Sequence, residues 1–391
     1  MTPPRTRSAL YRIAAIHFTT FAARGFAAPF ISLYLISVGF SGTQIGLLSS
    51  VSALLQLTLA PLLHRLADRT GRHRQLYYAL LTGNITASLG IVAFAANTLP
   101  LSGMILMRDS SDAPSTALLS QLTITWLDKK QNTYGRLRAW GSFGYAMTTM
   151  ISGYIFAAGG YGLLFVAATL LNLTLYPMIQ VLPARTAESY HRAAPHKSVS
   201  RGLVILLASL FLYFVGSAAF NSFMYVYFKQ SLGASNALIG VIACVSALSE
   251  IPAMMLIDRI LRRADLRIML PIGVLGLGAL WFILTQVTGT GLLIPLIMLR
   301  GTFYTLQLVC TTLLVSEISL PANVATNQAL AQVTVPGLAI LLTGSLNGWL
   351  FDHAGARVLF QIMALLSLLS VALLVATRAQ LHRPTEDNSA P

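Results

Sequence analysis

Seven ionisable residues stand inside long apolar stretches of this 391-residue sequence. A charge in an apolar environment is costly, so a residue kept there usually binds a ligand or carries a proton. Carboxylates can take up and release protons, and arginines hold anionic groups through paired N–H donors. We therefore expect a site that handles protons and a small solute together. The seven are Arg24, Arg108, Asp109, Asp112, Glu250, Arg300 and Glu317.

Three of these residues, Arg108, Asp109 and Asp112, are close together in one stretch. Arg108 and Asp112 are one helical turn apart and can pair, whereas Asp109 and Asp112 are close enough to repel each other. With Arg24 on a neighbouring helix, the group could bind and release a proton coupled to substrate. The same residues could equally form a static ion-pair cluster that joins the first and fourth stretches. Glu250 has no local partner and is a second candidate proton carrier.

Polar residues also recur at intervals of three and four in the stretch that holds Arg300, which places them on one side of a helix. They are Arg300, Tyr304, Gln307 and Thr311. This face suits a solute that forms hydrogen bonds, and Arg300 and Arg108 could clamp a carboxylate from opposite sides. We expect Asp109, Asp112 and Glu250 to carry protons, and Arg24, Arg108, Arg300, Tyr304 and Gln307 to contact substrate.

The elements that position these residues are apolar and long. The chain is 55% hydrophobic and 10% charged, with a mean hydropathy of +0.70, whereas a soluble domain carries roughly a quarter charged residues. Each apolar stretch is expected to be a helix, because unpaired backbone groups are too costly in lipid. This predicts an all-α membrane protein with twelve transmembrane helices. Their ranges are 10–38, 44–63, 75–96, 99–126, 139–158, 161–182, 202–228, 237–257, 268–288, 292–320, 324–350 and 356–377.

The basic residues are distributed as topology signals. If the N-terminus is cytoplasmic, 21 of the 26 Lys and Arg residues fall in cytoplasmic segments, and only Lys229 and Arg357 fall in outer ones. This asymmetry predicts that both termini are cytoplasmic in a multi-pass protein of the cell (inner) membrane. The net charge of +14 therefore does not indicate nucleic-acid binding, since the charges form no basic patch interleaved with aromatic residues.

The two halves of the chain resemble each other. When the second half is moved back by 194 positions, Ile45 and Gly46 meet Ile239 and Gly240, and residues 51–54 meet 245–248. At an offset of 195, Gly160 meets Gly355. The alternative is chance matching of small and aliphatic residues in oily helices. The ordered spacing favours two parallel six-helix repeats, residues 1–182 and 202–391, joined by a cytoplasmic linker at 183–201.

The loop after the second stretch reads Leu-Ala-Asp-Arg-Thr-Gly-Arg over 66–72. It resembles the signature loop of the major facilitator superfamily, although His64 stands where that motif begins with glycine. The resemblance implies a conformational loop formed by Asp68, Arg69, Gly71 and Arg72. In such a loop Asp68 can pair with a neighbouring arginine in one state of a rocking protein. The alternative is a plain positive anchor for the helix end.

A second motif, Tyr-Gly-Arg-Leu-Arg-Ala-Trp-Gly-Ser-Phe-Gly over 134–144, leads into the fifth stretch. It resembles a run in the superfamily branch that includes the phenylpropionate permease-like and lactose permease-like proton symporters. The resemblance covers essentially the whole chain and implies a central cavity lined by spans 1, 4, 7 and 10. It also implies secondary active transport by alternating access. We expect proton-coupled uptake of a small organic solute, anionic ones included, with proton-driven efflux of drugs or metabolites as the alternative.

Other function classes find less support in the sequence. It lacks a glycine-rich phosphate loop followed by Lys-Ser or Lys-Thr, and no catalytic constellation stands out, so we expect neither an ATP-driven pump nor an enzyme. Cys244 and Cys310 lie inside apolar stretches, which argues against disulfides and metal sites. No cofactor is expected. The expected partners are a small-molecule substrate, protons and the lipid bilayer, and the protein is expected to be a monomer. A membrane sensor or a lipid-modifying enzyme is the alternative from another class.

Overall fold

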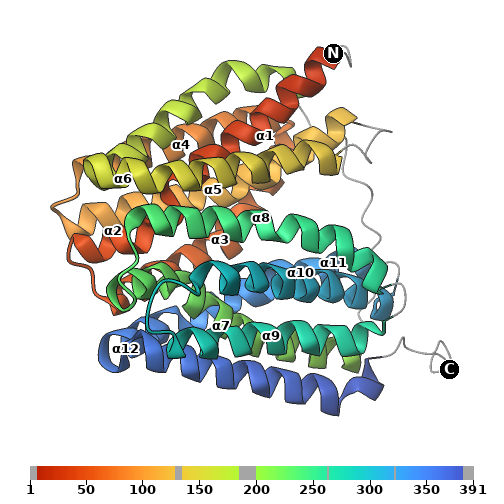
Figure 1. Ribbon diagram of the computed structural model, residues 1–391. Helices are drawn as coiled ribbons and strands as arrows, with labels where there is room; N and C mark the ends of the chain where they lie inside the picture. The colour runs from red at the N-terminus through yellow and green to blue at the C-terminus, as the bar shows by residue number, and fades with distance from the viewer. Residues whose placement is uncertain (1–6, 128–133, 185–199, 262–263, 321–322, 382–391) are drawn as a thin grey trace.

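The computed structural model describes residues 7–127, 134–184, 200–261, 264–320 and 323–381, and the secondary structure of these ranges is helical (Figure 1). The first six helices are α1 (Arg7–Ala27), α2 (Ile31–Ser37), α3 (Gly42–Thr70), α4 (His73–Ala93), α5 (Thr98–Leu127) and α6 (Tyr134–Met178). The others are α7 (Arg201–Gln230), α8 (Asn236–Leu261), α9 (Leu266–Gln286), α10 (Leu293–Ile318), α11 (Val324–Ala329) and α12 (Val335–Ala376). Short helical turns are η2 (Ile179–Val181), η4 (Leu330–Thr334) and η5 (Arg378–Gln380).

Nine helical segments of the described ranges are long and apolar enough to cross a membrane. One of them, Ser8–Ser37, contains both α1 and α2. The expected single stretch at 10–38 is thus interrupted, because Pro29 disfavours helical geometry at the residue before it. The polar residues of α5, Arg108, Asp109 and Asp112 among them, explain why this helix is not one of the nine.

Two glycines divide the longest helices. Gly160 in α6 and Gly355 in α12 have φ angles of 75° and 79°, a left-handed region that residues with a Cβ rarely adopt. In Figure 1 both helices turn on the side opposite the ends of the chain. These are the two glycines that the sequence comparison aligned at an offset of 195, and they fall between the stretches expected on either side of them.

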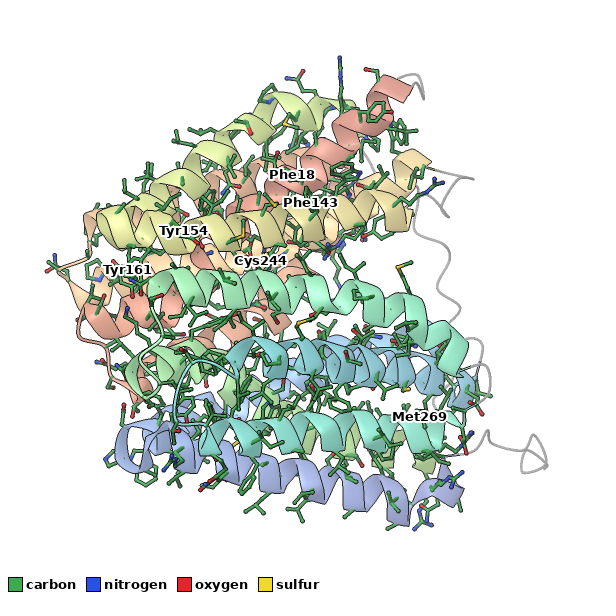
Figure 2. The ribbon with its side chains drawn as sticks, viewed as in Figure 1. Phe18, Phe143, Tyr154, Tyr161, Cys244 and Met269 are labelled. Carbon is green, nitrogen blue, oxygen red and sulfur yellow. The ribbon has the colours of Figure 1, made fainter. Side chains whose placement is uncertain are left out.

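The helices pack in two sets, α1 to α6 and α7 to α12. Within the first set α1 packs on α6 and α4 on α5, and within the second α12 packs on α7 and α9. Close packing depends on small residues. A Cβ added to Gly144 of α6 would lie 2.5 Å from the backbone oxygen of Phe18 in α1. The rings of Phe18 and Phe143, labelled in Figure 2, lie beside this contact with centroids 6.2 Å apart.

The main contacts between the sets join α3 to α12 and α6 to α8. They lie toward the end of the molecule where α3 begins, which is also the end where α6 and α12 turn. Gly42 and Gly46 of α3 face Gly348 and Gly344 of α12 so closely that a Cβ would meet the opposing backbone carbonyl. Toward the other end, where the chain starts and finishes, the ribbons of α6 and α8 diverge (Figure 1).

Asp352 of α12 adds a polar contact at the end of the molecule where α3 begins, which we call the closed end. The first turn of a helix leaves N–H groups without partners in the helix. Ser41 caps α3 by accepting from the backbone N–H of Gln44. The remaining donors, the N–H groups of Gly42 and Thr43, reach the two Asp352 carboxylate oxygens at 2.6 and 2.8 Å, and the Thr43 hydroxyl donates to the same carboxylate at 2.7 Å. Asp352 thus ties one set of helices to the other.

Candidate functional site

A cavity of about 580 Å³ lies between the two helix sets. Helices α1, α5, α7 and α10 contribute to it, as expected for spans 1, 4, 7 and 10, and so do α2, α6 and α8. Seven ionisable side chains line it: Arg24, Arg108, Asp109, Asp112, Arg138, Glu250 and Arg300. The neutral lining residues are Phe21, Ala28, Ile31, Ser142, Tyr145, Asn221, Met224, Tyr225, Ala243, Ser246 and Ala247.

Arg24 and Asp112 form an ion pair between α1 and α5. Arg24 Nη2 lies 2.7 Å from Asp112 Oδ2, and Arg24 Nη1 donates to the hydroxyl of Thr116 at 3.0 Å. Asp112 thus pairs across helices with Arg24 and not along its own helix with Arg108, which is the ion-pair arrangement between the first and fourth stretches that the sequence left open. The physical reason is that α1 contains no acidic residue. The half-buried Arg24 must find a partner on another helix, because an unpaired charge there is costly.

Arg108 and Asp109 form a looser pair on the same helix. The distance from Arg108 Nη1 to Asp109 Oδ1 is 3.8 Å, and the Arg108 side chain is only 11% exposed. Asp109 also accepts a hydrogen bond of 2.9 Å from the hydroxyl of Ser52 in α3. α5 therefore presents two acids in different settings, one against a close arginine and one against a hydroxyl.

Arg300 enters the cavity from α10 and is held by neutral groups. Its Nη1 donates to the hydroxyl of Ser246 in α8 and its Nη2 to the side-chain oxygen of Asn221 in α7, both at 3.1 Å. Its guanidinium carbon also lies 5.7 Å from the centroid of the Phe220 ring. Within the described residues no carboxylate lies at ion-pair distance from Arg300. Its positive charge therefore remains available to an anionic ligand.

Glu250 lines the cavity from α8, one turn after Ser246. Its carboxylate has no hydrogen bond or ion pair with any residue that the structure describes. Arg300 lines the same cavity from α10. Glu250 is thus an acid that lines the cavity and has no close partner among the described residues, in keeping with the expectation for it.

The rest of the expected polar face on α10 lies apart from the cavity lining. Tyr304 stands beside Arg300, with its ring centroid 5.9 Å from the guanidinium carbon. Gln307 is only 2% exposed and donates to the hydroxyl of Thr311 at 3.1 Å. A Cβ on Gly273 of α9 would touch Gln307, which shows that this part of the helix face packs against α9. The structure does not bring Gln307 together with the other proposed substrate contacts.

Four further lining residues did not emerge from the sequence analysis as site residues. Arg138, Ser142 and Tyr145 follow one face of α6, and Tyr225 lies one turn after Asn221 in α7. The guanidinium carbon of Arg138 lies 3.8 Å from the centroid of the Phe21 ring, a cation–π contact. The intervals of four and three residues from Arg138 to Tyr145 are a signal that could have placed it on an inward face.

The signature loop lies outside the cavity, where α3 ends and α4 begins. Gly71 caps α3 in the left-handed conformation with φ of 64°. Asp68 lies 2.9 Å from Nε2 of His73 rather than beside an arginine, so the expected arginine pairing is not the one in this structure. His73 is buried and close to Asp68 in sequence, which explains the pairing. Arg69 and Arg72 are exposed.

No group of three or more His, Cys, Asp or Glu residues in the described ranges could hold a metal ion. Cys244 and Cys310 are buried and unpaired as disulfides. The chemistry that the cavity offers is therefore ionic and hydrogen-bonding. It combines arginines from both helix sets with three carboxylates that differ in their contacts, beside aromatic rings.

Comparisons with known proteins agree with this geometry. Residues 10–362 match the model of the MFS_1 like family. The probable 3-phenylpropionic acid transporter of Escherichia coli (strain K12) is 26% identical over 365 residues, which cover 91% of this chain and 94% of the relative. The maltose permease of Geobacillus stearothermophilus is 27% identical over 276 residues, 68% of each protein.

Solved structures share the fold. The crystal structure of the nucleoside transporter NupG matches with a TM-score of 0.79 at 16% identity, over 95% of this chain and 98% of that one. A bacterial homologue of the human lysosomal transporter Spinster, in an inward-facing and unoccupied conformation, matches with a TM-score of 0.70 at 13% identity, over 97% of each chain. With a family match across most of its length, the chain belongs to the MFS_1 like family and is a multi-pass membrane transporter of the major facilitator superfamily, not an enzyme.

Proposed function

We propose that this transporter takes up a small organic anion together with protons by alternating access. The observation that carries the proposal is Arg300, which lines the cavity and, among the described residues, forms hydrogen bonds only with the neutral Asn221 and Ser246, so that its charge is left for a ligand. Arg24, Arg108 and Arg138 line the opposite side of the same cavity. The arginines of the two helix sets would together hold an anionic solute between them.

The architecture we propose has twelve membrane passes. The nine apolar segments become twelve when α5 is added and when the two helices bent at Gly160 and Gly355 are each counted as two passes. These passes form two like-oriented halves, 1–182 and 202–391, joined by the linker at 183–201. We propose that the linker and both termini are cytoplasmic, which the positive-inside distribution supports, and that the protein acts as a monomer in the inner membrane.

Alternating access is supported by the unequal ends of the molecule. One end is closed by the glycine contacts of α3 with α12 and by the Asp352 bonds to the start of α3. The helices α6 and α8 diverge toward the other end. Rocking of the two halves would break the Asp352 contact and bring the opposite ends together, near the loop of Asp68, Arg69, Gly71 and Arg72. This loop would then help to hold the second state.

The substrate class we propose is a small carboxylate with an apolar or aromatic body. Phe21, Tyr145, Met224 and Tyr225 give the cavity an aromatic and apolar wall beside the arginines. Aromatic rings pack well against such walls. A relative that covers most of the chain bears the name of a 3-phenylpropionic acid transporter, which fits this chemistry. Tyr304 would act through Arg300, and Gln307 would reach the substrate only if α10 moved against α9.

The proton sites we propose are Asp109, Asp112 and Glu250. Protonation of Asp112 would release Arg24 for the substrate, and loss of the proton would restore the ion pair of 2.7 Å. Glu250 stands near Arg300 and can alternate with a substrate carboxylate as the partner of that charge. Binding of substrate and of protons would thus be linked through the arginines that they share.

The test uses the purified full-length protein in liposomes with labelled 3-phenylpropionate and an inward proton gradient. Wild type should accumulate the acid, and a protonophore should abolish accumulation. Asp112→Asn should lose uphill accumulation but retain exchange of internal for external substrate, because exchange needs no proton release. Asp265→Asn, at a carboxylate outside the cavity, is the matched control and should behave as wild type. Accumulation by Asp112→Asn at the wild-type level would refute the proton assignment.

Proton-driven efflux of drugs or metabolites is the alternative, since the same fold can run in either direction. Liposomes tested with an inward and with an outward proton gradient, at the same external substrate concentration, distinguish uptake from efflux. Coupled uptake fills the vesicles as protons enter, whereas an antiporter fills them as protons leave. If 3-phenylpropionate is not transported but maltose or a nucleoside is, the proposed substrate class is wrong. Proton coupling would then be measured with the substrate that is transported.

A further inference from the structure

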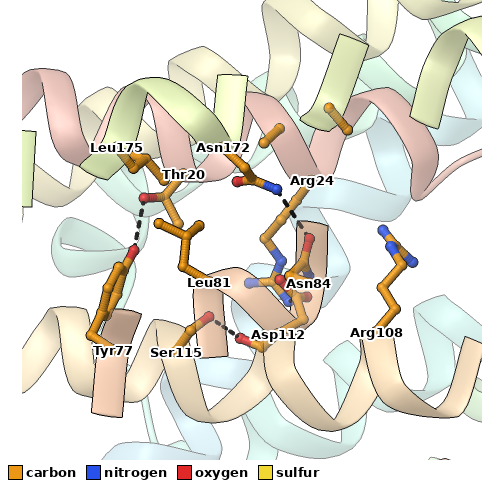
Figure 3. Close-up of a pocket in the computed structure, with 12 residues that line it drawn as sticks. Thr20, Arg24, Tyr77, Leu81, Asn84, Arg108, Asp112, Ser115, Asn172 and Leu175 are labelled. Carbon is orange, nitrogen blue, oxygen red and sulfur yellow. Dashed lines mark hydrogen bonds and ion pairs between the residues drawn. The ribbon is translucent and has the colours of Figure 1, made fainter. Parts of the chain in front are cut away.

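A second and much smaller space lies behind the Arg24–Asp112 ion pair, inside the first helix set (Figure 3). Its volume is about 20 Å³, enough for a single water molecule. We call it the side chamber. Residues of α1, α4, α5 and α6 line it, and Arg24, Arg108 and Asp112 border both this space and the central cavity. The two spaces therefore meet at the proposed proton site.

Some polar side-chain atoms that border the side chamber have no hydrogen-bond partner among the described residues. Asn172 of α6 is only 7% exposed and donates to the side-chain oxygen of Asn84 in α4 at 3.0 Å. No described residue bonds to the amide nitrogen of Asn84 or to the side-chain oxygen of Asn172. Neither atom is among the fully buried side-chain atoms without a partner, so each keeps accessible surface at which a water molecule can complete its hydrogen bonds. Both groups border a space of the right size for a water molecule.

Asp112 offers a third polar atom to the same space. Its Oδ2 binds Arg24, whereas its Oδ1 has no partner among the described residues. A hydroxyl that could compete for the carboxylate is turned elsewhere, because Ser115 donates to the backbone oxygen of Asp112 at 2.8 Å. A carboxylate oxygen accepts hydrogen bonds readily and prefers more than one. The chamber thus presents acceptors and a donor around a site of water size.

We propose that the side chamber holds one bound water molecule, fixed by Asn84 and Asn172, which serves as the standing hydrogen-bond partner of Asp112. This inference rests on the proposed function, since it assigns the water to the proton-coupling step. When a proton reaches Asp112 and Arg24 leaves, the water accepts from the new O–H or donates to the free oxygen. Asn84 and Asn172 are therefore positioning residues for proton exchange and do not contact substrate.

Other occupants fit the chamber less well. A metal cation would lie beside the guanidinium groups of Arg24 and Arg108, which repel it. An anion would face the Asp112 carboxylate, and an organic solute exceeds the volume. Water alone can both donate to Asp112 and accept from an amide, and buried waters usually make about three such bonds.

The test compares Asn172→Leu, which fills the chamber with methyl groups, with Asn172→Ser, which keeps a hydroxyl and leaves room for water. A structure of the full-length protein at a resolution that shows waters should contain a density peak at hydrogen-bond distance from Asp112 in wild type and in Asn172→Ser. The peak should be absent in Asn172→Leu. A wild-type chamber without density would overturn the proposal.

Transport of 3-phenylpropionate in liposomes supplies the second readout. Asn172→Leu should lower uphill accumulation about ten- to hundredfold, as expected when a hydrogen bond to a charged group is lost. Substrate exchange should stay within about twofold of wild type, and Asn172→Ser should retain both activities. Asn84→Leu, from the opposite wall, should repeat the result if Asn172→Leu folds poorly. Unchanged accumulation, or exchange lost in parallel with accumulation, would refute the role in proton exchange.

The two readouts separate this inference from the function on which it rests. If wild type binds the water but shows no proton-dependent accumulation, the proposed function fails and the water site stands as a structural feature. If wild type accumulates substrate and the chamber is empty, the function stands and the water site is refuted.

Discussion

Replacing Asp352 by alanine should open the closed end of the transporter. The side chain joins the two helix sets through three hydrogen bonds to Gly42 and Thr43, at 2.6, 2.8 and 2.7 Å. Two of the donors are N–H groups in the first turn of α3, where a negative charge is favoured by the helix dipole. No other described side chain accepts from those two N–H groups, so the variant leaves them to water.

The size of the effect follows from the number and exposure of these bonds. A hydrogen bond to a charged group contributes about 1.5–3 kcal/mol when it is shielded from water. Asp352 is exposed, so solvent competes for its oxygens and the three bonds together should contribute only about 1–2 kcal/mol. A difference of that size changes the ratio of closed to open molecules by roughly 5- to 30-fold.

Cysteine labelling measures that ratio. Cys244 and Cys310 are first replaced by serine, and Ala28, which lines the cavity, is replaced by cysteine. In intact cells an impermeant maleimide should reach residue 28 only when the closed end, proposed to face outward, opens. Asp352→Ala should raise the labelling rate about 5- to 30-fold, in line with the estimated free energy.

Two matched variants interpret the result. Thr43→Val removes one of the three bonds and should raise the rate less than Asp352→Ala. Asp265→Ala removes an acid at the opposite end and should leave the rate unchanged. A rate for Asp352→Ala within twofold of its parent would show that the three bonds do not hold the closed end. An equal rise in Asp265→Ala would show that labelling reports general loosening of the fold.

Three further predictions concern the cavity, the contact between α3 and α12, and the effect of pH on stability. Arg300→Ala should weaken the binding of 3-phenylpropionate by about ten- to hundredfold, as measured by titration calorimetry. Arg300→Lys should recover only part of the lost affinity, because lysine lacks the planar guanidinium. Unchanged affinity in Arg300→Ala would show that Arg300 does not bind the substrate. Gly46→Val should prevent the close contact of α3 with α12 and should lower both uptake and the melting temperature. Unchanged transport would show that this contact is not tight in the working protein. The backbone N–H of Arg267 and the side chain of Arg378 lower the pKa of Asp265. Its contribution to stability should therefore be complete above the usual aspartate pKa of about 4 and fall as the pH drops through the lowered value; melting curves of Asp265→Asn should lack this acid-dependent step.

Much of the helix pattern could be predicted from hydropathy and breakers. The stretches expected at 75–96 and 268–288 correspond to α4 (His73–Ala93) and α9 (Leu266–Gln286) within a few residues. The expected breaks near Gly160 and Gly355 coincide with left-handed backbone. The break between α1 and α2 was missed, because apolar residues continue on both sides of Pro29 and outweigh the proline in a hydropathy pattern.

The cavity charges could also be predicted, but their partners could not. Charge within an apolar stretch was enough to select Arg24, Asp112 and Arg300, since lipid tolerates few such residues. Local spacing left two arrangements open for Asp112, a pair with Arg108 on the same helix and a cluster with Arg24 across helices, and the choice between them depends on how α1 crosses α5. Arg138 was missed for a related reason. A basic residue near a helix end is interpreted first as a topology signal, and this interpretation outweighed the spacing that aligns Arg138 with Ser142 and Tyr145 on one face of α6.

Gln307 and Asp352 illustrate what sequence spacing leaves open. A run of polar residues defines one face of α10 but does not reveal that part of this face packs on Gly273 of α9. Asp352 and Thr43 are 309 residues apart, and nothing in either local sequence indicates the contact. Both depend on the relative placement of whole helices, which a pattern along a single helix cannot specify.

The net charge of the cavity links substrate binding to proton binding. Four arginines and three carboxylates line it, so one positive charge is left over when all are ionised. A monovalent anion would neutralise that charge, and the loaded cavity would then move through the membrane field without net charge. Moving an unbalanced charge costs about 2.3 kcal/mol per 100 mV. A proton added to one of the carboxylates would restore the single positive charge with which the empty cavity returns, so a cycle that carries one anion and one proton would move no net charge. The protonation of Asp109, Asp112 and Glu250 therefore decides whether transport responds to voltage or to the pH gradient alone.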